Sequence, residues 1–200
     1  MSNVFQDLIF EVNDDIFQQN TAQSRDWLRK QAAAVRESQA KKDARDLAAF
    51  HGKNLVRAGH MHMFQYLPAT REKLPFYDMF PVVFPFRRHQ GGFHAINLHY
   101  LPHNMRAILM DNLYKVVSES EASGEMYLKA FTYKMLNSSS RFRFFKPCVR
   151  QYLNKNVISR FIYVPFNQWE IALFLPLERF RGATKKEVFQ HSREIIRDHK

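Results

Sequence analysis

The sequence predicts an α+β fold in which a small, bent antiparallel sheet, or an SH3-like barrel, carries inserted helices. Three observations lead to this prediction. Apolar side chains alternate at every second position in two runs, 80–86 and 94–100, which a glycine-bearing turn separates. Apolar residues at helical spacing follow in 105–117, and helix-prone sequence without proline or glycine precedes the strands in 24–50. Period two is typical of a half-buried strand, whereas spacings of three and four are typical of an amphipathic helix.

Two hundred residues suit one domain with appendages, or at most two small domains. We expect an N-terminal helical arm over 1–58, an α+β core domain over 59–180 and a C-terminal helix over 181–200. The arm has a thin apolar stripe, so two interpretations stay open: a solvated helix, or a helix that folds against a neighbouring subunit. The candidate residues for such a protein–protein contact are Trp27, Leu28 and Val35.

The central element is a hairpin over 76–102. Its first strand places four apolar side chains on one parity: Phe80, Val82, Phe84 and Phe86. Pro81 and Pro85 have the opposite parity. Proline cannot donate to a strand ladder, so this strand is expected at a sheet edge or with bulges at the prolines. The run 59–67 predicts another strand, with His62 and Phe64 on one face and the intervening methionines on the other.

The remaining elements follow from spacing and capping signals. Pro102 suits the first position of a helix that ends near Ser118. Thr184 and Glu187 have the spacing of a capping box and open a terminal helix. Further elements are expected at 127–136 (helix), 147–153 (a short helix opened by Pro147), 160–165 (strand) and 169–175 (apolar helix).

The positive charge is concentrated in one window. The formal net charge is +11, and residues 126–169 contain eight basic and no acidic side chains, interleaved with aromatic ones. Cations neutralise phosphates and aromatic faces stack on bases, which favours a nucleic-acid surface. Alternatively, the aromatic residues fill the core and the cations lie on its solvated outside, where they can meet an acidic partner protein; the 19 phenylalanines favour this second interpretation. The candidate contact residues are Arg141, Arg143, Lys146, Arg150, Lys155 and Arg160.

Catalytic signatures are absent from the sequence. It contains no P-loop, GxGxxG, HExxH or GxSxG motif. We therefore predict a protein that is not an enzyme, with no catalytic residues, no cofactor and no metal site. His60 and His62 form one HxH pair without a third ligand, which is typical of structural histidines. The single cysteine, Cys148, excludes an intramolecular disulfide framework and is expected to be a small buried hydrophobe.

Several ordered blocks resemble a family of virion and assembly proteins of contractile-tailed, T-even-like bacteriophages. They are SRDWLRKQA at 24–32, GHMHMFQYLPATREKLPFYDMFPVVFPF at 59–86, GGFHAINLHYLPHNMRAILMDNL at 91–113, SRFRFFKPCVRQYL at 140–153 and QWEIALFLPLERF at 168–180. The resemblance implies a component of the neck, tail or baseplate. Proteins that cap the ends of packaged DNA belong to the same group, and no catalytic residues are implied.

Two function hypotheses follow. The first is a non-enzymatic structural or assembly component of a tailed-phage virion that works through contacts with other virion proteins in a symmetric oligomer. The alternative is a DNA-binding protein that protects the ends of packaged phage DNA. Both place the chain in the virion, and in the host cytoplasm during assembly. No signal peptide or membrane span is expected, because the N-terminus lacks a basic region and no apolar run reaches about 18 residues.

Overall fold

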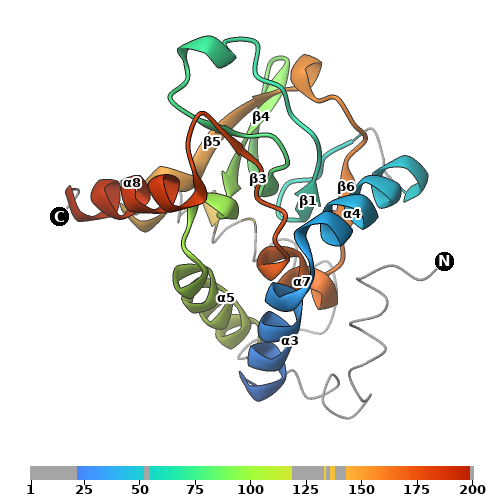
Figure 1. Cartoon of the computed structure of the whole chain (residues 1–200), viewed down its shortest axis with the longest axis vertical. Helices are drawn as coiled ribbons and strands as arrows, with labels where there is room; N and C mark the ends of the chain where they lie inside the picture. The colour runs from blue at the N-terminus through green and yellow to red at the C-terminus, as the bar shows by residue number, and fades with distance from the viewer. Residues whose placement is uncertain (1–21, 52–54, 119–132, 134–135, 138–142, 199–200) are drawn as a thin grey trace.

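The computed structural model of the chain describes residues 22–51, 55–118, 133, 136–137 and 143–198. Its strands form a five-stranded antiparallel sheet and a separate two-stranded one. Figure 1 shows this sheet above helices α3, α5 and α7, with α8 at one side. The predicted α+β class and bent antiparallel sheet are confirmed. The described strands do not close into a barrel, because the sheet ends at two edge strands.

The α-helices are α3 (Ala22–Ala34), α4 (Glu37–His51), α5 (His103–Ser118), α7 (Trp169–Phe174) and α8 (Lys185–Asp198). The strands are β1 (Met61–Met63), β2 (Tyr77–Asp78), β3 (Val82–His89), β4 (Gly92–Asn97), β5 (Val149–Leu153), β6 (Ile162–Val164) and β7 (Phe180–Arg181). Short 3-10 helices are η1 (Arg71–Lys73), η2 (Leu98–Tyr100), η3 (Arg143–Cys148), η4 (Asn154–Asn156) and η5 (Phe166–Gln168). The large sheet has the order β5-β4-β3-β1-β6, and β2 pairs with β7.

The β3–β4 hairpin confirms the predicted alternation. The four apolar side chains of the first strand all lie in the main hydrophobic core, which the helices cover. The pairing register shifts between Pro85 and Arg87, so the predicted bulge is confirmed. The alternative of an edge strand is wrong, since β3 lies between β4 and β1. Pro85 lacks an N–H, but its carbonyl oxygen still accepts a hydrogen bond from Gly59 at 2.9 Å.

The segment 147–153 corrects the sequence analysis. A short helix opened by Pro147 was expected there, but 149–153 forms strand β5, which pairs with β4 from Gly92 to Ile96. Pro147 instead lies inside the 3-10 helix η3 that precedes the strand. Local sequence favours a turn of helix, whereas the decisive partner, β4, lies more than fifty residues away in the chain. Long-range pairing therefore overrides local preference here.

Beyond β5 the chain wraps around the sheet. Val157 forms an isolated antiparallel bridge with Tyr66, the amide of Ile158 donates to the carbonyl of Gln65 at 3.0 Å, and β6 then pairs with β1. This curl encloses a second core, which we call the aromatic cluster. It consists of Val56, Phe64, Tyr66, Val83, Phe93, Ala95, Tyr152 and Phe161.

The described part of the N-terminal arm packs against its own chain. Helices α3 and α4 place Leu28, Ala32, Ala40 and Ala44 in the main core, and Trp27 and Val35 lie half-buried against it. The expected solvated helix is therefore wrong for these residues. Leu28 is only 4% exposed, so its side chain is already covered without a partner subunit. The single helix expected over 24–50 is also divided, with a break at residues 35–36.

A buried ion-pair network fixes α3 to the rest of the fold. The Arg29 guanidinium donates from Nε and Nη2 to both carboxylate oxygens of Glu170 in α7, at 2.7 and 2.9 Å. Its Nη2 also donates to Asp111 of α5 at 2.9 Å. The Glu170 side chain is only 1% exposed, so the guanidinium is its main source of charge compensation. Paired, bidentate geometry of this kind is strong and directional.

The other helix boundaries follow the sequence closely. Helix α5 begins directly after Pro102 and ends at Ser118, as predicted. Thr184 and Glu187 form the predicted capping box: the Thr184 amide donates to the Glu187 carboxylate at 2.7 Å, and the Glu187 amide donates back to the Thr184 hydroxyl. The helix expected over 127–136 lies largely outside the described residues. Among the described helices, none combines the length and apolar character that a membrane span requires.

Arg29→Ala should destabilise the fold strongly. The substitution leaves the buried Glu170 carboxylate without its partner, so we expect the free energy of unfolding to fall by about 3–5 kcal/mol. Urea denaturation measures this change. Lys30→Ala, at the exposed next position of the same helix, is the control and should change stability by less than about 0.5 kcal/mol. Equal losses in the two variants would contradict a structural role for the network.

Glu178 should make stability depend on acid pH. Its buried carboxylate contacts Arg106 Nη1 at 2.6 Å and Lys185 Nζ at 2.9 Å. Burial alone would raise the pKa of Glu178, but the charge of Arg106 and a hydrogen bond with His103 lower it well below the ordinary 4.5. A depressed carboxyl pKa stabilises the folded state above the unfolded-state pKa, and this stabilisation is lost as the pH falls below that value.

We therefore expect the free energy of unfolding to decrease as the pH falls below 4.5, the ordinary pKa of this group. Glu178→Gln should have a flatter dependence over that range, since it cannot be protonated. Urea denaturation at a series of pH values between about 5 and 3 measures both slopes. An unchanged slope in the variant would contradict this assignment.

Candidate nucleic-acid interface

Three stretches of the chain contain no acidic residue, and the sheet brings them together. Residues 47–71, 79–110 and 126–169 lack Asp and Glu entirely. These stretches supply all five strands of the large sheet. The tip of the β3–β4 hairpin lies next to η4, since the Asn154 amide donates to the Gly91 carbonyl at 2.9 Å. In Figure 1 this tip lies at the top of the molecule, away from α3 and α5.

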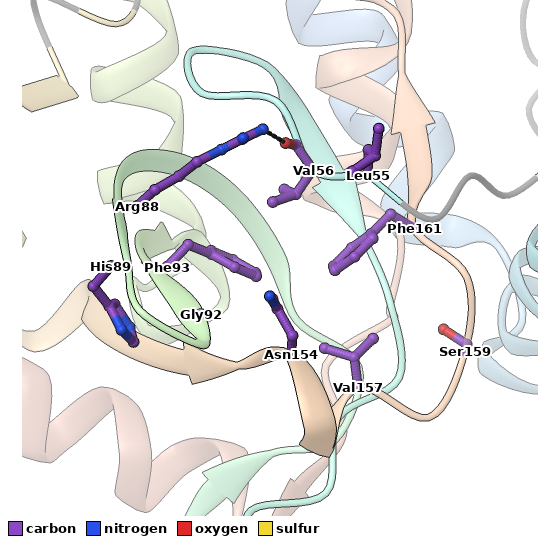
Figure 2. A pocket seen from close by; sticks show the side chains of 10 residues that line it. All are labelled: Leu55, Val56, Arg88, His89, Gly92, Phe93, Asn154, Val157, Ser159 and Phe161. Carbon is purple, nitrogen blue, oxygen red and sulfur yellow. Dashed lines mark hydrogen bonds between the residues drawn. The ribbon is translucent and has the colours of Figure 1, made fainter.

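A pocket of about 330 Å³ opens at this end of the sheet, and we call it the tip pocket. Figure 2 shows the residues that line it. Its apolar lining residues are Leu55, Val56, Phe93, Val157 and Phe161. Its polar lining residues are Arg88, His89, Asn154 and Ser159, and Gly92 completes the lining. The pocket is the open end of the aromatic cluster. Val56, Phe93 and Phe161 belong to this cluster, and Val157 packs against it.

Ring contacts connect the aromatic floor of the pocket to the aromatic cluster. The rings of Phe93 and Phe161 enter from opposite sides, as Figure 2 shows, with centroids 5.9 Å apart. Phe93 also stacks on Tyr152 at 5.5 Å, and Phe161 meets Phe64 edge to face at 5.1 Å. Aromatic pairs at these separations attract each other beyond their burial. These contacts stabilise the position of both rings.

Arg88 spans the mouth of the pocket. Its Nη2 donates to the carbonyl oxygen of Val56 at 2.8 Å, and Figure 2 shows the guanidinium reaching across from the hairpin. Next to it, His89 Nδ1 donates to the Gln90 carbonyl at 2.9 Å, and its Nε2 lies 3.3 Å from the Gln151 amide nitrogen. In the neutral ring this geometry makes Nε2 the acceptor. Arg88 is thus held in place with several N–H groups still directed to solvent.

Five exposed cations lie at or near the sheet tip. We call them the tip cations: Arg57, Arg87, Arg88, Lys155 and Arg160. Arg88 lines the tip pocket, and the other four are adjacent in sequence to residues that line it. Lys155 itself lines a different surface depression. Within the described residues none of them forms an ion pair, whereas the buried Arg29 and Arg106 both do. Uncompensated positive charge on one surface attracts polyanions.

The six cations predicted to contact nucleic acid or an acidic partner are not gathered at one place. Lys155 and Arg160 are tip cations, and Lys146 is exposed on η3. Arg150 lies on β5 with its guanidinium 4.0 Å from the centroid of the Tyr100 ring, in a second hollow of about 540 Å³. Arg141 lies outside the described residues, and Arg143 is placed only as part of η3. Their contact with DNA or an acidic protein stays a prediction.

Arg57, Arg87, Arg88 and His89 were missed as site residues by the sequence analysis. The signal for Arg88 and His89 was present, since both lie in the polar, glycine-bearing turn expected between the two strands of the hairpin, and Arg87 directly precedes this turn. Their relation to Asn154 and Phe161 depends on strand pairing between distant segments, which spacing along the chain does not reveal. Arg57 has no comparable local signal.

His60 and His62 lie at and next to strand β1, and the hydrogen bonds of His62 are structural. His62 Nδ1 donates to the His60 carbonyl at 3.1 Å, and its Nε2 accepts from the Arg57 amide at 3.4 Å. Burial, together with the nearby His60 and Arg57, lowers the pKa of His62 to about 4. Both ring nitrogens are thus engaged in a neutral ring. Among the described residues no three His, Cys, Asp or Glu side chains are arranged to hold a metal ion.

A second buried polar network lies beneath the Tyr100 hollow. Asp78 accepts from His99 Nδ1 at 2.8 Å and from the Asn97 amide at 3.0 Å. Burial alone would raise the pKa of Asp78, but His99 and these hydrogen bonds lower it overall. His99 is fully buried, so this pair has no access to a substrate in this structure. Cys148 is also fully buried, and burial raises its pKa to about 12, which disfavours the reactive thiolate.

A protein-family model described as "Phage T4 terminal DNA protecting protein" matches residues 11–197. The chain belongs to this family. The resemblance to T-even-like phage proteins is therefore confirmed, and the match extends beyond the blocks on which the resemblance was based. No match occurs among curated proteins or solved structures.

The family match favours one of the two function hypotheses without testing its details. Its description fits the alternative hypothesis, a protein that protects the ends of phage DNA, better than the first hypothesis of a structural component of the tail, baseplate or neck. The phage context is common to both. Contacts with other virion proteins and a symmetric oligomer stay predictions.

Gly92→Ala should distort the interface. An added Cβ would lie 2.0 Å from the Tyr152 carbonyl oxygen of β5, whereas a Cβ on Gly91 would meet nothing within 4 Å. Gly91 has a φ of 77°, so its substitution introduces only backbone strain. We expect unfolding free energies to fall by about 3 kcal/mol for Gly92→Ala and by about 1–2 kcal/mol for Gly91→Ala.

Urea denaturation measures both losses, and amide hydrogen exchange of β5 shows whether the Gly92 variant loosens this strand. Faster exchange in Gly92→Ala alone is expected. A larger loss for Gly91→Ala would contradict the close approach of β4 and β5.

Proposed function

We propose that this chain is a non-enzymatic protein that binds the ends of double-stranded phage DNA and protects them by covering them. Membership in the DNA-terminal protecting family supports this proposal. The observation that carries it to particular residues is the group of unpaired tip cations around an aromatic pocket. Exposed arginines that lack carboxylate partners are suited to phosphate oxygens, because their planar N–H groups match phosphate geometry.

Electrostatics supports binding of a polyanion at this end of the sheet. The acidic side chains Asp26, Asp111, Glu170 and Glu178 form ion pairs on the helical side, with Arg25, Arg29, Arg106 and Lys185. The tip cations, in contrast, form no ion pair with the residues that the structure describes. Phosphate contacts of this kind supply sequence-independent affinity, which suits a protein that must accept any terminal sequence.

Protection requires no chemistry on the DNA. A protein that occupies the end blocks an exonuclease by steric exclusion, so the proposal needs no catalytic residue, metal or cofactor. We propose that this occurs in the phage particle and during its assembly in the host cytoplasm. We also propose that the chain contacts other virion proteins and forms a symmetric oligomer. The phage context alone supports these two points.

The test compares open and closed DNA ends. One duplex has a blunt end and a hairpin loop at the other end; a second duplex of the same length has loops at both ends. We expect tighter binding to the open end by fluorescence anisotropy, and slower exonuclease digestion of the blunt strand. Affinity should fall steeply between about 50 and 200 mM salt, because phosphate contacts release counterions.

Substitutions locate the binding surface. Arg88→Ala with Arg160→Ala removes two tip cations and should reduce the slope of log affinity against log salt by about 2. The matched control, Lys186→Ala with Arg193→Ala, removes two exposed charges from α8 and should retain the wild-type slope.

Two results would contradict the proposal. Equal affinity for open and closed duplexes would indicate a general DNA-binding protein. No binding at the lowest salt concentration would assign the positive surface to an acidic protein partner instead.

A further inference from the structure

Phosphate binding explains the tip cations but leaves the tip pocket without an occupant. Cations on a flat or convex surface suffice to hold a DNA backbone. Here Arg88 lines a concave site with an apolar floor that includes Phe161 and Val157. Its volume of about 330 Å³ lies within the range of sites that enclose small organic groups, roughly 300–1,000 Å³. The pocket thus combines a cation at its mouth with an apolar floor.

The cation at the mouth and the apolar floor below it match the phosphate and the base of one nucleotide. Arg88 crosses the mouth, fixed by its hydrogen bond to the Val56 carbonyl at 2.8 Å, with further N–H groups available to a phosphate. The floor below offers Phe93 and Phe161 ring edges and aliphatic side chains to a flat, weakly polar group. A nucleobase is such a group, and aromatic or apolar side chains accept any base because every base has a π-face.

Asn154 provides a polar contact at the inner wall. Its side chain points into the pocket from η4, as Figure 2 shows. It is exposed, and its side-chain amide makes no hydrogen bond to the part of the chain that the structure describes, whereas its backbone N–H donates to Gly91. An amide group both donates and accepts hydrogen bonds, so it can pair with the edge of any base.

We propose that the tip pocket binds the unpaired terminal base of one DNA strand at the duplex end, with Arg88 on the adjoining phosphate and Asn154 at the base edge. This inference rests on the proposed end binding and makes its ligand specific. The pocket would take a base that has left the terminal pair, or the single unpaired base of an overhang.

A site of this kind distinguishes an end from the interior of a duplex. A base at the end of the helix stacks on one neighbour, whereas an internal base stacks on two and is more costly to extract. Extraction is least costly for a base that is already unpaired. The pocket would therefore add a preference for ends to the general phosphate affinity of the tip cations.

The test separates the base from its phosphate. The first probe is a hairpin-closed duplex whose open end carries one overhanging nucleotide. The second carries an abasic nucleotide at the same position, with identical sugar and phosphate. Both 3′ and 5′ overhangs are used with the full-length protein. Phe93 and Phe161 are only 1% and 7% exposed and offer ring edges, so we expect the base to increase affinity by about 5-fold over the abasic site, the lower end of the range for a stacked base.

A pocket-filling variant assigns the effect to this site. Val157→Phe places a larger apolar side chain into the pocket from its floor and should abolish the difference between base and abasic probes while retaining salt-dependent binding. Ile158→Phe is the matched control. Ile158 is 56% exposed and lines a different surface depression, so its variant should keep the difference. Both substitutions keep an apolar side chain at a position that is not fully buried, which favours retention of the fold. Retained salt-dependent binding by Val157→Phe shows that the variant is folded.

The outcomes distinguish this inference from the proposed function. Equal affinity for base and abasic overhangs, with open ends still preferred over closed ones, would overturn the terminal-base site and leave end binding intact. A base preference that persists in Val157→Phe would place the base elsewhere and also overturn it. Absence of any preference for open ends would overturn both.

Discussion

The curl of the sheet depends on one continuous segment, residues 149–164, which hydrogen-bonds to two different parts of the fold. Its first strand extends the sheet beside β4, its middle bridges to Tyr66, and its last strand pairs with β1 at the opposite edge. Because one segment reaches both places, the sheet must bend around the aromatic cluster. The tip pocket is the unfilled end of that cluster, so its shape is a direct consequence of this pairing.

Ion pairing distinguishes the buried arginines of the helical side from the exposed cations of the sheet tip. On the helical side, arginines such as Arg29 and Arg106 are buried with carboxylates and connect helices to one another. At the sheet tip, exposed cations have no such partners in the described part of the chain. Buried pairs are compensated locally and contribute little field outside, whereas the tip cations attract anions from solution. The aromatic floor beneath them distinguishes this surface from a simple basic patch.

Local signals account for the correct predictions. The alternation around Val82 and Phe84, the helix after Pro102 and the capping box at Thr184 are each determined by residues within a few positions of one another. The errors share one cause, which is dependence on distant partners. The segment that forms β5 was expected to be helical, because the local sequence after Pro147 favours a helix and its pairing partner β4 is distant in the chain. The arm was expected to be solvated or to bind another subunit, because neither Glu170 nor the core that covers Leu28 lies near it in the chain.

The candidate site shows the same division. The sequence by itself determined the α+β class, the phage family resemblance and a positive charge concentrated in acid-free stretches. Composition and ordered blocks suffice for these, since they do not depend on where a residue lies in space. The tertiary structure decided which cations share a surface. Arg88 lines the same pocket as Asn154 and Phe161, whereas Arg150 lies in a separate hollow over the Tyr100 ring. That selection follows from strand register and from the bend of the sheet, which are set by hydrogen bonds between segments far apart in the chain.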